Sequence, residues 1–409
     1  MTVRRRKRKA HWLTPTITPC PYVHREVALP APNKQGALFY DVFESEPLAV
    51  SFPDEYVRER DAKERERNRE AMKAVKEAGF IPLPTFFTRP DGERVEVATW
   101  VHPDFIPSCS EGFLERNGVA YNVYIPSFGR PDAPTVKKLI SKFDLDCWYL
   151  FIDPESFAEY GQHYPLRHLI VRNPIFRSEE FTQLYSPVSS PNGWHGTSGI
   201  YNSILAFSQS LGEKRYWTMD DDLLTMAMKA YKGDKKLIPG TPYNKFDFYR
   251  CSRLSPEFGF TLNEYLRQME EFSEKIINSG FITIEKFGIY FDRPFSFTIG
   301  TRAYTFYLTD NSKQVAHFPQ HNNDVATSIE MDKMGYYTIL FNGISYHSMP
   351  TQVGGGLTEL YRAFGTLDKG KALVRAQPLV SKIVYKFSRI HHIVNYAEFV
   401  PRARLLMED

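Results

Sequence analysis

Three consecutive aspartates, Asp220, Asp221 and Asp222, come directly after the apolar run of residues 215–219. Carboxylates at the end of a buried strand repel one another, and removing them from water costs free energy. A divalent cation offsets both costs, because Mn²⁺ and Mg²⁺ prefer oxygen ligands and complete their shells with substrate phosphates. The sequence therefore predicts a metal on Asp220 and Asp222, bridging a nucleotide diphosphate beside Asp221. The alternative is a solvated acidic turn.

Two histidines could add a ligand to the same cation. His347 follows a late apolar stretch, and a neutral imidazole is a common metal ligand. His321 competes for the role. A single histidine can equally serve the fold, so His347 is the predicted third metal ligand and His321 the alternative.

Asp324 stands at the start of an amphipathic stretch, residues 324–334, that ends at Gly335. A carboxylate at a helix N-terminus is stabilised by the exposed backbone amides, so Asp324 could be a cap. The functional interpretation is a general base that removes the proton of an attacking hydroxyl. We predict that Asp324 is the catalytic residue.

Two glycine-containing loops could contact a nucleotide. The turn IPSFGRP offers Ser127 and Arg130 to a base or phosphate. The loop containing Gly354 and Gly355 could close over phosphates with free backbone amides. Both are also common turn sequences, and neither is specific by itself.

These residues fall at the ends of predicted strands. Strands are expected at residues 119–125, 147–152, 168–171 and 215–219, with helices at 133–143 and 198–211 between them. Alternating strands and helices predict βαβ units and a mainly parallel sheet, and ligands bind beyond the carboxyl ends of such strands. Asp153 and Arg172 end the second and third strands, so we predict both in the nucleotide site.

Flanking segments are expected to extend this core. A charged helix is predicted at 54–79 and two short strands within 80–118. Later elements are a helix at 260–279, antiparallel strands within 281–309, a strand at 336–341 with a turn at 342–343, and a helix from about 357. We divide the chain into an N-terminal extension (1–118), a core (119–350) and a basic C-terminal segment (351–409).

Composition is that of an ordinary globular protein of 409 residues with a net charge of +3. No apolar run is long enough to span a bilayer, no signal segment is present, and the four cysteines are scattered. We expect a soluble, cytoplasmic protein. Basic residues cluster in residues 4–9 and in the last forty or so positions, where they could bind phosphates or form a solvated tail.

The order of motifs resembles the nucleotide-sugar glycosyltransferases of the GT-A fold. The resemblance covers roughly residues 119–350 and rests on YIPSFGRP, FIDP, NSILAFSQSLGEKRYWTMDDD and HNNDVATSIEMDKMGYYTILFNGISYH. It implies an α/β fold with a Rossmann-like nucleotide-binding half, and a DxD metal motif at Asp220 and Asp222. It further implies Asn202 in the donor site, a base at Asp324 and a metal ligand at His347.

Residues 348–380 narrow the resemblance to the TET-associated glycosyltransferases, which are phage-type enzymes that add sugars to hydroxymethylated pyrimidines in DNA. The similarity rests on the Gly-Gly loop, Tyr361, Lys369-Gly370-Lys371 and Gln377-Pro378. It implies a UDP-sugar donor contacted by Lys371, an acceptor of the 5-hydroxymethylcytosine type in double-stranded DNA, and the cytoplasm of a bacterial host. Acceptors such as a glycan, a protein or a small molecule stay open, as does a non-catalytic scaffold.

The last segment has a composition that suits DNA. Cations alternate with aromatic residues at Lys382, Tyr385, Lys386, Arg389, His391 and His392, a mixture that holds a phosphate backbone. A hydroxymethyl group on the pyrimidine ring could be reached in the major groove or by flipping the base. The sequence does not choose between these routes.

Overall fold

The computed structural model describes residues 54–88, 93–132, 134–142, 145–177, 197–231, 248–250, 262–286, 297–314, 316–319, 321–349, 367–386, 389–398 and 405–407. Within these ranges its main sheet has the strands β1 (Ile81–Thr88), β2 (Arg94–Val101), β3 (Val123–Pro126), β4 (Trp148–Ile152), β5 (Leu169–Val171), β6 (Arg215–Met219), β7 (Leu223–Tyr231), β8 (Phe248–Arg250), β9 (Ser279–Lys286), β10 (Phe297–Ile299), β11 (Phe306–Asp310) and β12 (Tyr337–Ser348). The α-helices are α2 (Asp54–Glu77), α3 (Phe113–Asn117), α4 (Phe157–Gly161), α6 (Ser198–Ser210), α7 (Leu262–Glu274), α8 (Asn323–Lys333) and α10 (Leu367–Ala376).

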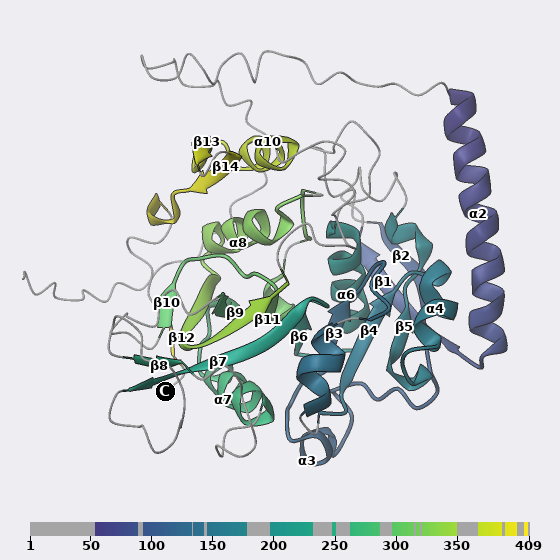
Figure 1. Ribbon diagram of the computed structural model, residues 1–409, viewed down its shortest axis with the longest axis horizontal. Coiled ribbons are helices and arrows are strands. Elements are labelled where there is room, and N and C mark those ends of the chain that lie inside the picture. Colours follow the sequence, from purple (N-terminus) through teal and green to yellow (C-terminus); the bar gives the residue numbers. More distant parts are fainter. Residues whose placement is uncertain are drawn as a thin grey trace, which may run out of the picture.

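The strands are arranged in the order β1-β2-β5-β4-β3-β6-β11-β9-β12-β7-β8, with β10 paired to β12. Helices flank this sheet (Figure 1), which confirms the predicted α/β class. The four strands β5, β4, β3 and β6 are parallel, as predicted. Beyond β6 the sheet is mixed, because β11 pairs antiparallel with both β6 and β9, and β12 is parallel to β9 and antiparallel to β7.

Alternation of side chains along the parallel strands builds two cores. Tyr124, Phe151 and Ile170 point to the face covered by α6, where they meet Ile204 and Phe207. Their strand neighbours fill the opposite core, which also takes up residues of α4: Val123, Ile125, Leu150, Ile152, Leu169, Val171, Phe157 and Tyr160. Because both faces are covered, these strands are apolar at nearly every position, which is why they stand out in the sequence.

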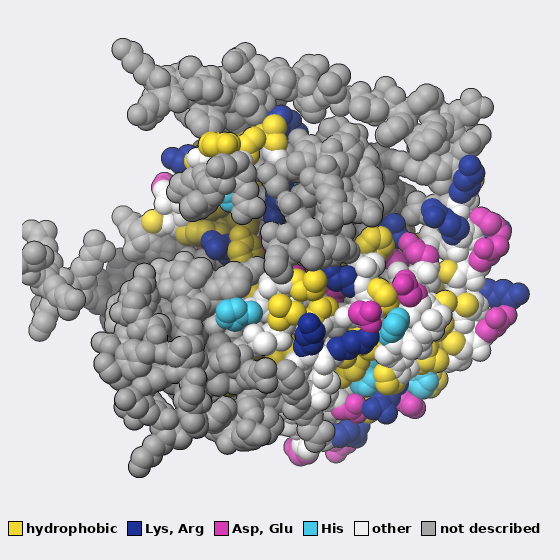
Figure 2. Space-filling view, in the orientation of Figure 1, with side chains coloured by type: hydrophobic (Ala, Val, Ile, Leu, Met, Phe, Trp, Pro, Cys, Tyr) yellow, Lys and Arg dark blue, Asp and Glu magenta, His cyan; other side chains and the backbone are white. Residues whose placement is uncertain are grey.

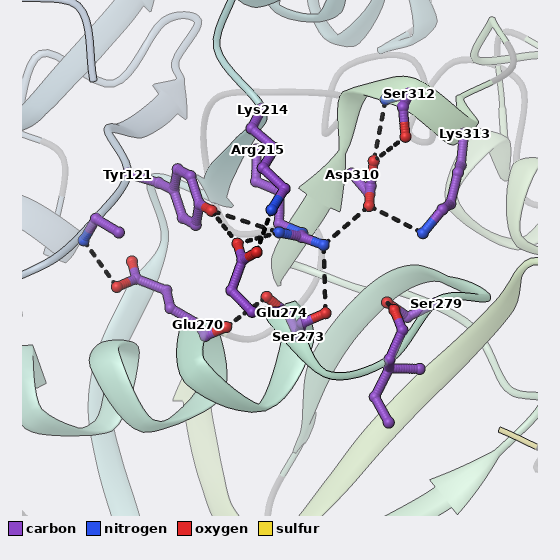
Figure 3. Close-up of polar contacts among 12 residues, drawn as sticks. Tyr121, Lys214, Arg215, Glu270, Ser273, Glu274, Ser279, Asp310, Ser312 and Lys313 are labelled. Atoms are coloured by element: carbon purple, nitrogen blue, oxygen red, sulfur yellow. Dashed lines mark hydrogen bonds and ion pairs between the residues drawn. The ribbon is translucent and has the colours of Figure 1, made fainter. Parts of the chain in front are cut away.

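The end of β6 away from the aspartates is anchored by a polar network (Figure 3). Arg215, the first residue of β6, donates to Asp310 of β11 over 3.1 Å and to the carbonyl of Ser273 over 3.2 Å. It also contacts Glu274 at the end of α7, which Tyr121 and Lys214 contact in turn. These bonds fix α7 against the sheet and hold β6 in register, so the position of the aspartates at its other end is well defined.

The N-terminal extension is partly built into the sheet. The predicted helix is present as α2, and the two predicted short strands are β1 and β2. β2 pairs antiparallel with β5, where Trp100 lies opposite Val171. The main sheet therefore begins well before the predicted core boundary at residue 119.

Two local predictions are wrong. Residues 135–142 form a π-helical turn, Thr135–Leu139, and a 3-10 turn, Ile140–Lys142, in place of a regular helix. The predicted turn at 342–343 lies inside β12, whose pairing with β9 shifts register between Phe341 and Ser345. Since β12 has hydrogen-bonded neighbours on both sides, ladder pairing outweighs the turn preference of Asn342-Gly343, and the mismatch becomes a bulge.

The C-terminal residues form a small unit above α8 (Figure 1). It consists of α10 and a two-stranded antiparallel ribbon of β13 (Ser381–Lys386) and β14 (Arg389–Val394). Residues 287–296, in the middle of the predicted antiparallel strands, and the start of the helix predicted from 357 lie outside the described residues. No helix in the described part of the chain is long and apolar enough to cross a membrane.

Candidate functional site

The middle aspartate is held by the turn that follows β3. Ser127 Oγ donates to Asp221 Oδ2 over 2.6 Å, and Arg130 Nη1 donates to Oδ1 over 2.5 Å. Burial raises the pKa of the Asp221 carboxyl, while Arg130 and Ser127 oppose that rise. Three of the predicted nucleotide-site residues are therefore in direct contact, and Asp221 fastens the turn after β3 to the end of β6.

Tyr160 completes this junction and was not singled out in the sequence. Its hydroxyl lies 2.7 Å from Ser127 Oγ and accepts a hydrogen bond of 3.1 Å from the backbone N–H of Arg130. Tyr160 belongs to α4, and its ring is buried in the core. A buried tyrosine has no local pattern that separates it from other core aromatics, so only the fold reveals this role.

Asp220 is bound from both sides of the sheet. Tyr201 of α6 donates to Asp220 Oδ1 over 2.6 Å, and the Asp220 backbone N–H donates to the carbonyl of Thr305 over 2.7 Å. Thr135 Oγ1 donates to the Asp220 carbonyl over 2.6 Å. Burial, followed by the neighbouring charge of Asp222, raises the pKa of the Asp220 carboxyl to about 8. The carboxylates of Asp220 and Asp222 thus repel each other in a buried environment where water screens their charges poorly.

The carboxylates of this site suit a divalent cation only if a substrate supplies further ligands. Within the described residues, no group of three or more His, Cys, Asp or Glu side chains is arranged to hold a metal ion. Asp220 and Asp222 supply two carboxylates whose repulsion a cation would relieve. Two protein carboxylates with the remaining ligands taken from phosphates and water is the usual arrangement for Mg²⁺. The pair therefore suits an ion that is bound together with a diphosphate.

The structure brings the end of β12 alongside the aspartates. His347 lies opposite Thr225 of β7, and the backbone N–H of Met349 donates to the Asp222 carbonyl over 2.9 Å. His347 is half-buried on this edge. His321 lies just before α8, is buried, and has its pKa lowered to about 4 by burial and by the charge of Lys369. Strand pairing thus favours His347 over His321 as the neighbour of Asp222.

Asp324 lies in the first turn of α8, on the same site as the aspartates. Its Oδ1 accepts a hydrogen bond of 2.9 Å from the Val325 N–H. Burial raises the pKa of its carboxyl, and the positive charges of Lys369 and Arg302 oppose the rise. The charge of Asp324 in turn contributes to the raised pKa of Asp220, so the two carboxylates share one electrostatic environment. Lys369 and Arg302 were not predicted as site residues.

The N-terminus of α6 is tied to the N-terminus of α8. Thr197 Oγ1 donates to Asn323 Oδ1 over 2.7 Å. Asn202 Nδ2 donates to the His317 carbonyl over 3.0 Å, and the His317 N–H donates back to Asn202 Oδ1 over 2.6 Å. The structure thus places Asn202 as the anchor of the segment that leads into α8, and this pairing occupies both ends of its side-chain amide.

A second polar cluster lies where β4 and β5 end. Asp153 and Arg172 form a buried, bidentate ion pair, with Nη2 to Oδ2 at 3.1 Å. Arg177 lies 3.5 Å from Asp153, and its guanidinium is 5.6 Å from the centre of the Phe128 ring. Phe128 is 46% exposed and belongs to the same turn as Ser127. The turn after β3 therefore joins the Asp153 cluster to the aspartate triplet.

The contacts above do not include three predicted residues, two of which the structure does not describe. Gly354 and Gly355 lie outside the described residues. Lys371 lies on α10, in the C-terminal unit, where it is half-buried. Its neighbour Lys369 is the lysine whose charge acts on Asp324. Asn202 lies within α6, and the other predicted residues gather at the carboxyl ends of β3, β4, β5 and β6, at the start of α8 and near the end of β12.

Comparison with known proteins agrees with this arrangement. The sequence model of the TET-associated glycosyltransferases matches residues 121–356, which is more than half of the chain and spans β3, the aspartate triplet, α8 and β12. No curated protein matches the chain significantly. From its motifs, its fold and this match, the chain belongs to the TET-associated glycosyltransferase family and is an enzyme of the glycosyltransferase class.

Proposed function

We propose that the enzyme transfers a sugar from a nucleoside-diphosphate donor, expected to be a UDP-sugar, to a hydroxymethylated pyrimidine in double-stranded DNA. The acceptor would be of the 5-hydroxymethylcytosine type. One observation carries the proposal: the N-terminal part of α6 holds Asp220, through Tyr201, and the start of α8 that carries Asp324, through the bond from Thr197 to Asn323. A leaving-group site and a base for the acceptor are thus next to each other, in a chain whose family modifies DNA.

The turn after β3 and the ends of β4 and β5 suit the nucleoside half of the donor. Phe128 offers an exposed aromatic face to a base, and the paired Asp153 and Arg172 offer fixed hydrogen-bonding groups beneath it. Arg130, held by Asp221, carries a positive charge towards the phosphates. Such groups, fixed by their own partners, bind without a large ordering cost.

Asp220, Asp222 and His347 are the residues proposed to hold Mn²⁺ or Mg²⁺. When bound, the ion would neutralise charge on the diphosphate as it leaves. Tyr201 and Thr305 keep Asp220 in place for this role through the two hydrogen bonds described above.

Asp324 is proposed as the general base. Its carboxylate accepts the proton of the acceptor hydroxyl while the hydroxyl oxygen forms the new bond to C1 of the sugar. The bond from C1 to the diphosphate oxygen breaks, and its electron pair leaves with the diphosphate. Burial raises the pKa of Asp324 towards the range in which a carboxylate is an effective base. The positive charges of Lys369 and Arg302 oppose part of that rise.

The direct test is acceptor choice. The full-length enzyme is incubated with Mn²⁺, a panel of UDP-sugars and matched duplexes that contain either cytosine or 5-hydroxymethylcytosine, and the digested nucleosides are measured by mass spectrometry. The expected product is a nucleoside heavier by one sugar, formed from the modified duplex alone.

An Asp222→Asn variant should form product about 10²-fold more slowly or worse, while Asp132→Asn, an exposed aspartate close in sequence to Arg130, should be as active as wild type. Transfer to a glycan, a protein or a free small molecule, with none to modified DNA, would refute the proposed acceptor while leaving the transferase class intact.

A further inference from the structure

The C-terminal unit concentrates positive charge. Residues 369–397 contain six Lys or Arg residues and no Asp or Glu, in a chain whose net charge is only +3. This stretch covers most of α10 and the whole β13–β14 ribbon. Dark blue and yellow side chains gather over this unit in Figure 2. A segment with no carboxylates attracts polyanions without competition from its own side chains.

The register of the ribbon sorts its residues onto two faces. Ser381 lies opposite Val394, and Ile383 lies opposite His392. Ser381 and Ile383 are buried, and Ile383 packs against α10 at Gly370. This face is therefore the one that holds the ribbon to the helix.

The other face is open. Lys382, which is exposed, lies opposite Ile393, and Val384 lies opposite His391. The same alternation places Lys386 opposite Arg389 at the hairpin end. Tyr385, which alternates onto the face of Ile383, is 66% exposed, and Leu379, which precedes β13, is 77% exposed. On the open face the exposed Lys382 thus lies among the half-buried Val384, His391 and Ile393.

The unit is fixed to the helix that carries Asp324. Leu373 of α10 and Val380 pack against Val325, Ala326 and Ile329 of α8. Gln377 Nε2 donates to Glu330 over 2.6 Å, and Asn322 Nδ2 donates to the Lys369 carbonyl over 2.7 Å. Anything bound by the ribbon is therefore held at a defined position relative to the start of α8.

We infer that the open face of the β13–β14 ribbon, which carries the exposed Lys382 and belongs to the basic stretch 369–397, binds the sugar-phosphate backbone of the duplex that carries the acceptor base. This inference rests on the proposed function and names the surface that presents DNA to Asp324. Positions 382 and 386 are roughly 13 Å apart along a strand. A duplex carries one charge per about 1.7 Å of axis and so meets cations at any such spacing, whereas an acidic protein would need carboxylates placed to match.

The test is a salt series of DNA binding by the full-length enzyme. Fluorescence anisotropy measures its affinity for an unmodified duplex with wild type, Lys382→Glu and the double variant Lys382→Glu/Lys386→Glu. Each lost phosphate contact should reduce the slope of log K against log salt by about 1. Lys275→Glu, an exposed lysine just after α7, is the matched control and should leave the slope unchanged. Lys382→Gln and a thermal melt of each variant exclude an effect of misfolding.

The outcomes separate the inference from the proposed function. The inference predicts a higher KM for the duplex acceptor in the ribbon variants, with donor hydrolysis unchanged. If wild type modifies DNA but the ribbon variants keep its KM and salt slope, the inference is wrong and the function stands. If the variants lose DNA binding but wild type transfers no sugar to modified DNA, the function fails and the ribbon surface stands. Equal slope changes with poly-glutamate would assign the ribbon to acidic proteins and overturn the inference.

Discussion

Tyr201 of α6 donates a hydrogen bond of 2.6 Å to Asp220, the residue that ends β6. The same helix end reaches α8 through the bond from Thr197 to Asn323. A single helix N-terminus thus fixes the distance between the strand that carries the acidic triplet and the helix that carries Asp324. Five predictions follow from this geometry and from the packing around it.

Tyr201→Phe should weaken donor binding while the protein stays folded. The substitution removes the hydroxyl that orients Asp220 and leaves the ring packed beside His317. A hydrogen bond to a charged group contributes about 1.5–3 kcal/mol, which corresponds to a loss of roughly tenfold or more in affinity. Calorimetric titration of UDP in the presence of Mn²⁺ measures it. Unchanged affinity would show that Tyr201 does not position Asp220 for the metal that binds the diphosphate.

Asp221→Ala and Asp222→Ala should fail in different ways. Removing Asp221 breaks its ion pair with the mostly buried Arg130, which should cost about 3–5 kcal/mol of stability. Removing Asp222 should leave the melting temperature near that of wild type but lower turnover by about 10²–10³-fold, as expected for loss of an electrostatic group at the leaving group. Thermal melts and single-turnover assays on both variants distinguish the two roles. Equal effects on stability would contradict this division.

Asp324→Asn should lower kcat far more than it changes the Kd for the donor. The amide keeps an oxygen that can accept the Val325 N–H bond, so the helix cap is preserved, but it cannot take up a proton. A loss of about 10²–10⁴-fold is expected for removal of a general base. A parallel rise in the donor Kd would instead identify Asp324 as a structural cap. Asp104→Asn, an exposed aspartate after β2, is the control.

Two glycine substitutions should change the free energy of unfolding in opposite directions. A Cβ at Gly199 would lie 2.2 Å from the carbonyl oxygen of Phe176, so the backbone must move, and Gly199→Ala should destabilise the protein by about 1–3 kcal/mol. At Gly370 in α10 the nearest atom is at an ordinary 3.5 Å. Gly370→Ala should therefore stabilise by about 0.5–1 kcal/mol through helix propensity. Urea denaturation of both variants measures the two values.

His317 should make the protein sensitive to acid. Its ring is buried, neither ring nitrogen has a hydrogen-bond partner among the described residues, and burial lowers its pKa to about 3. The unfolded chain has the ordinary value of about 6.5 and binds the proton first. Stability is thus fully present above pH 6.5 and is lost as pH falls from there towards 3. His317→Phe should flatten this part of the stability curve, measured by denaturation from pH 7 to pH 4. An unchanged slope would assign the loss of stability in acid to His321 and His392, whose pKa values are also lowered by burial.

The sequence alone determined the class of fold and much of the site. The strands that end at Pro126, Ile152, Val171 and Met219 are buried on both faces, so each is a largely apolar run followed by polar residues. Parallel strands run in the same direction, so their carboxyl ends and the polar residues that follow lie at one edge of the sheet. Ser127, Arg130 and Asp221 are in contact for this reason.

Tertiary structure decided how the parts meet. Nothing near Asn342-Gly343 reveals that β12 continues to Ser348, because the neighbours that override the turn come from β7 and β9, far away in the sequence. Tyr201 and Tyr160 look like core aromatics until the fold brings their hydroxyls to Asp220 and Ser127. Side-chain periodicity records which face is buried, but the partner of a buried polar atom is set by long-range packing, and so it appears only in three dimensions.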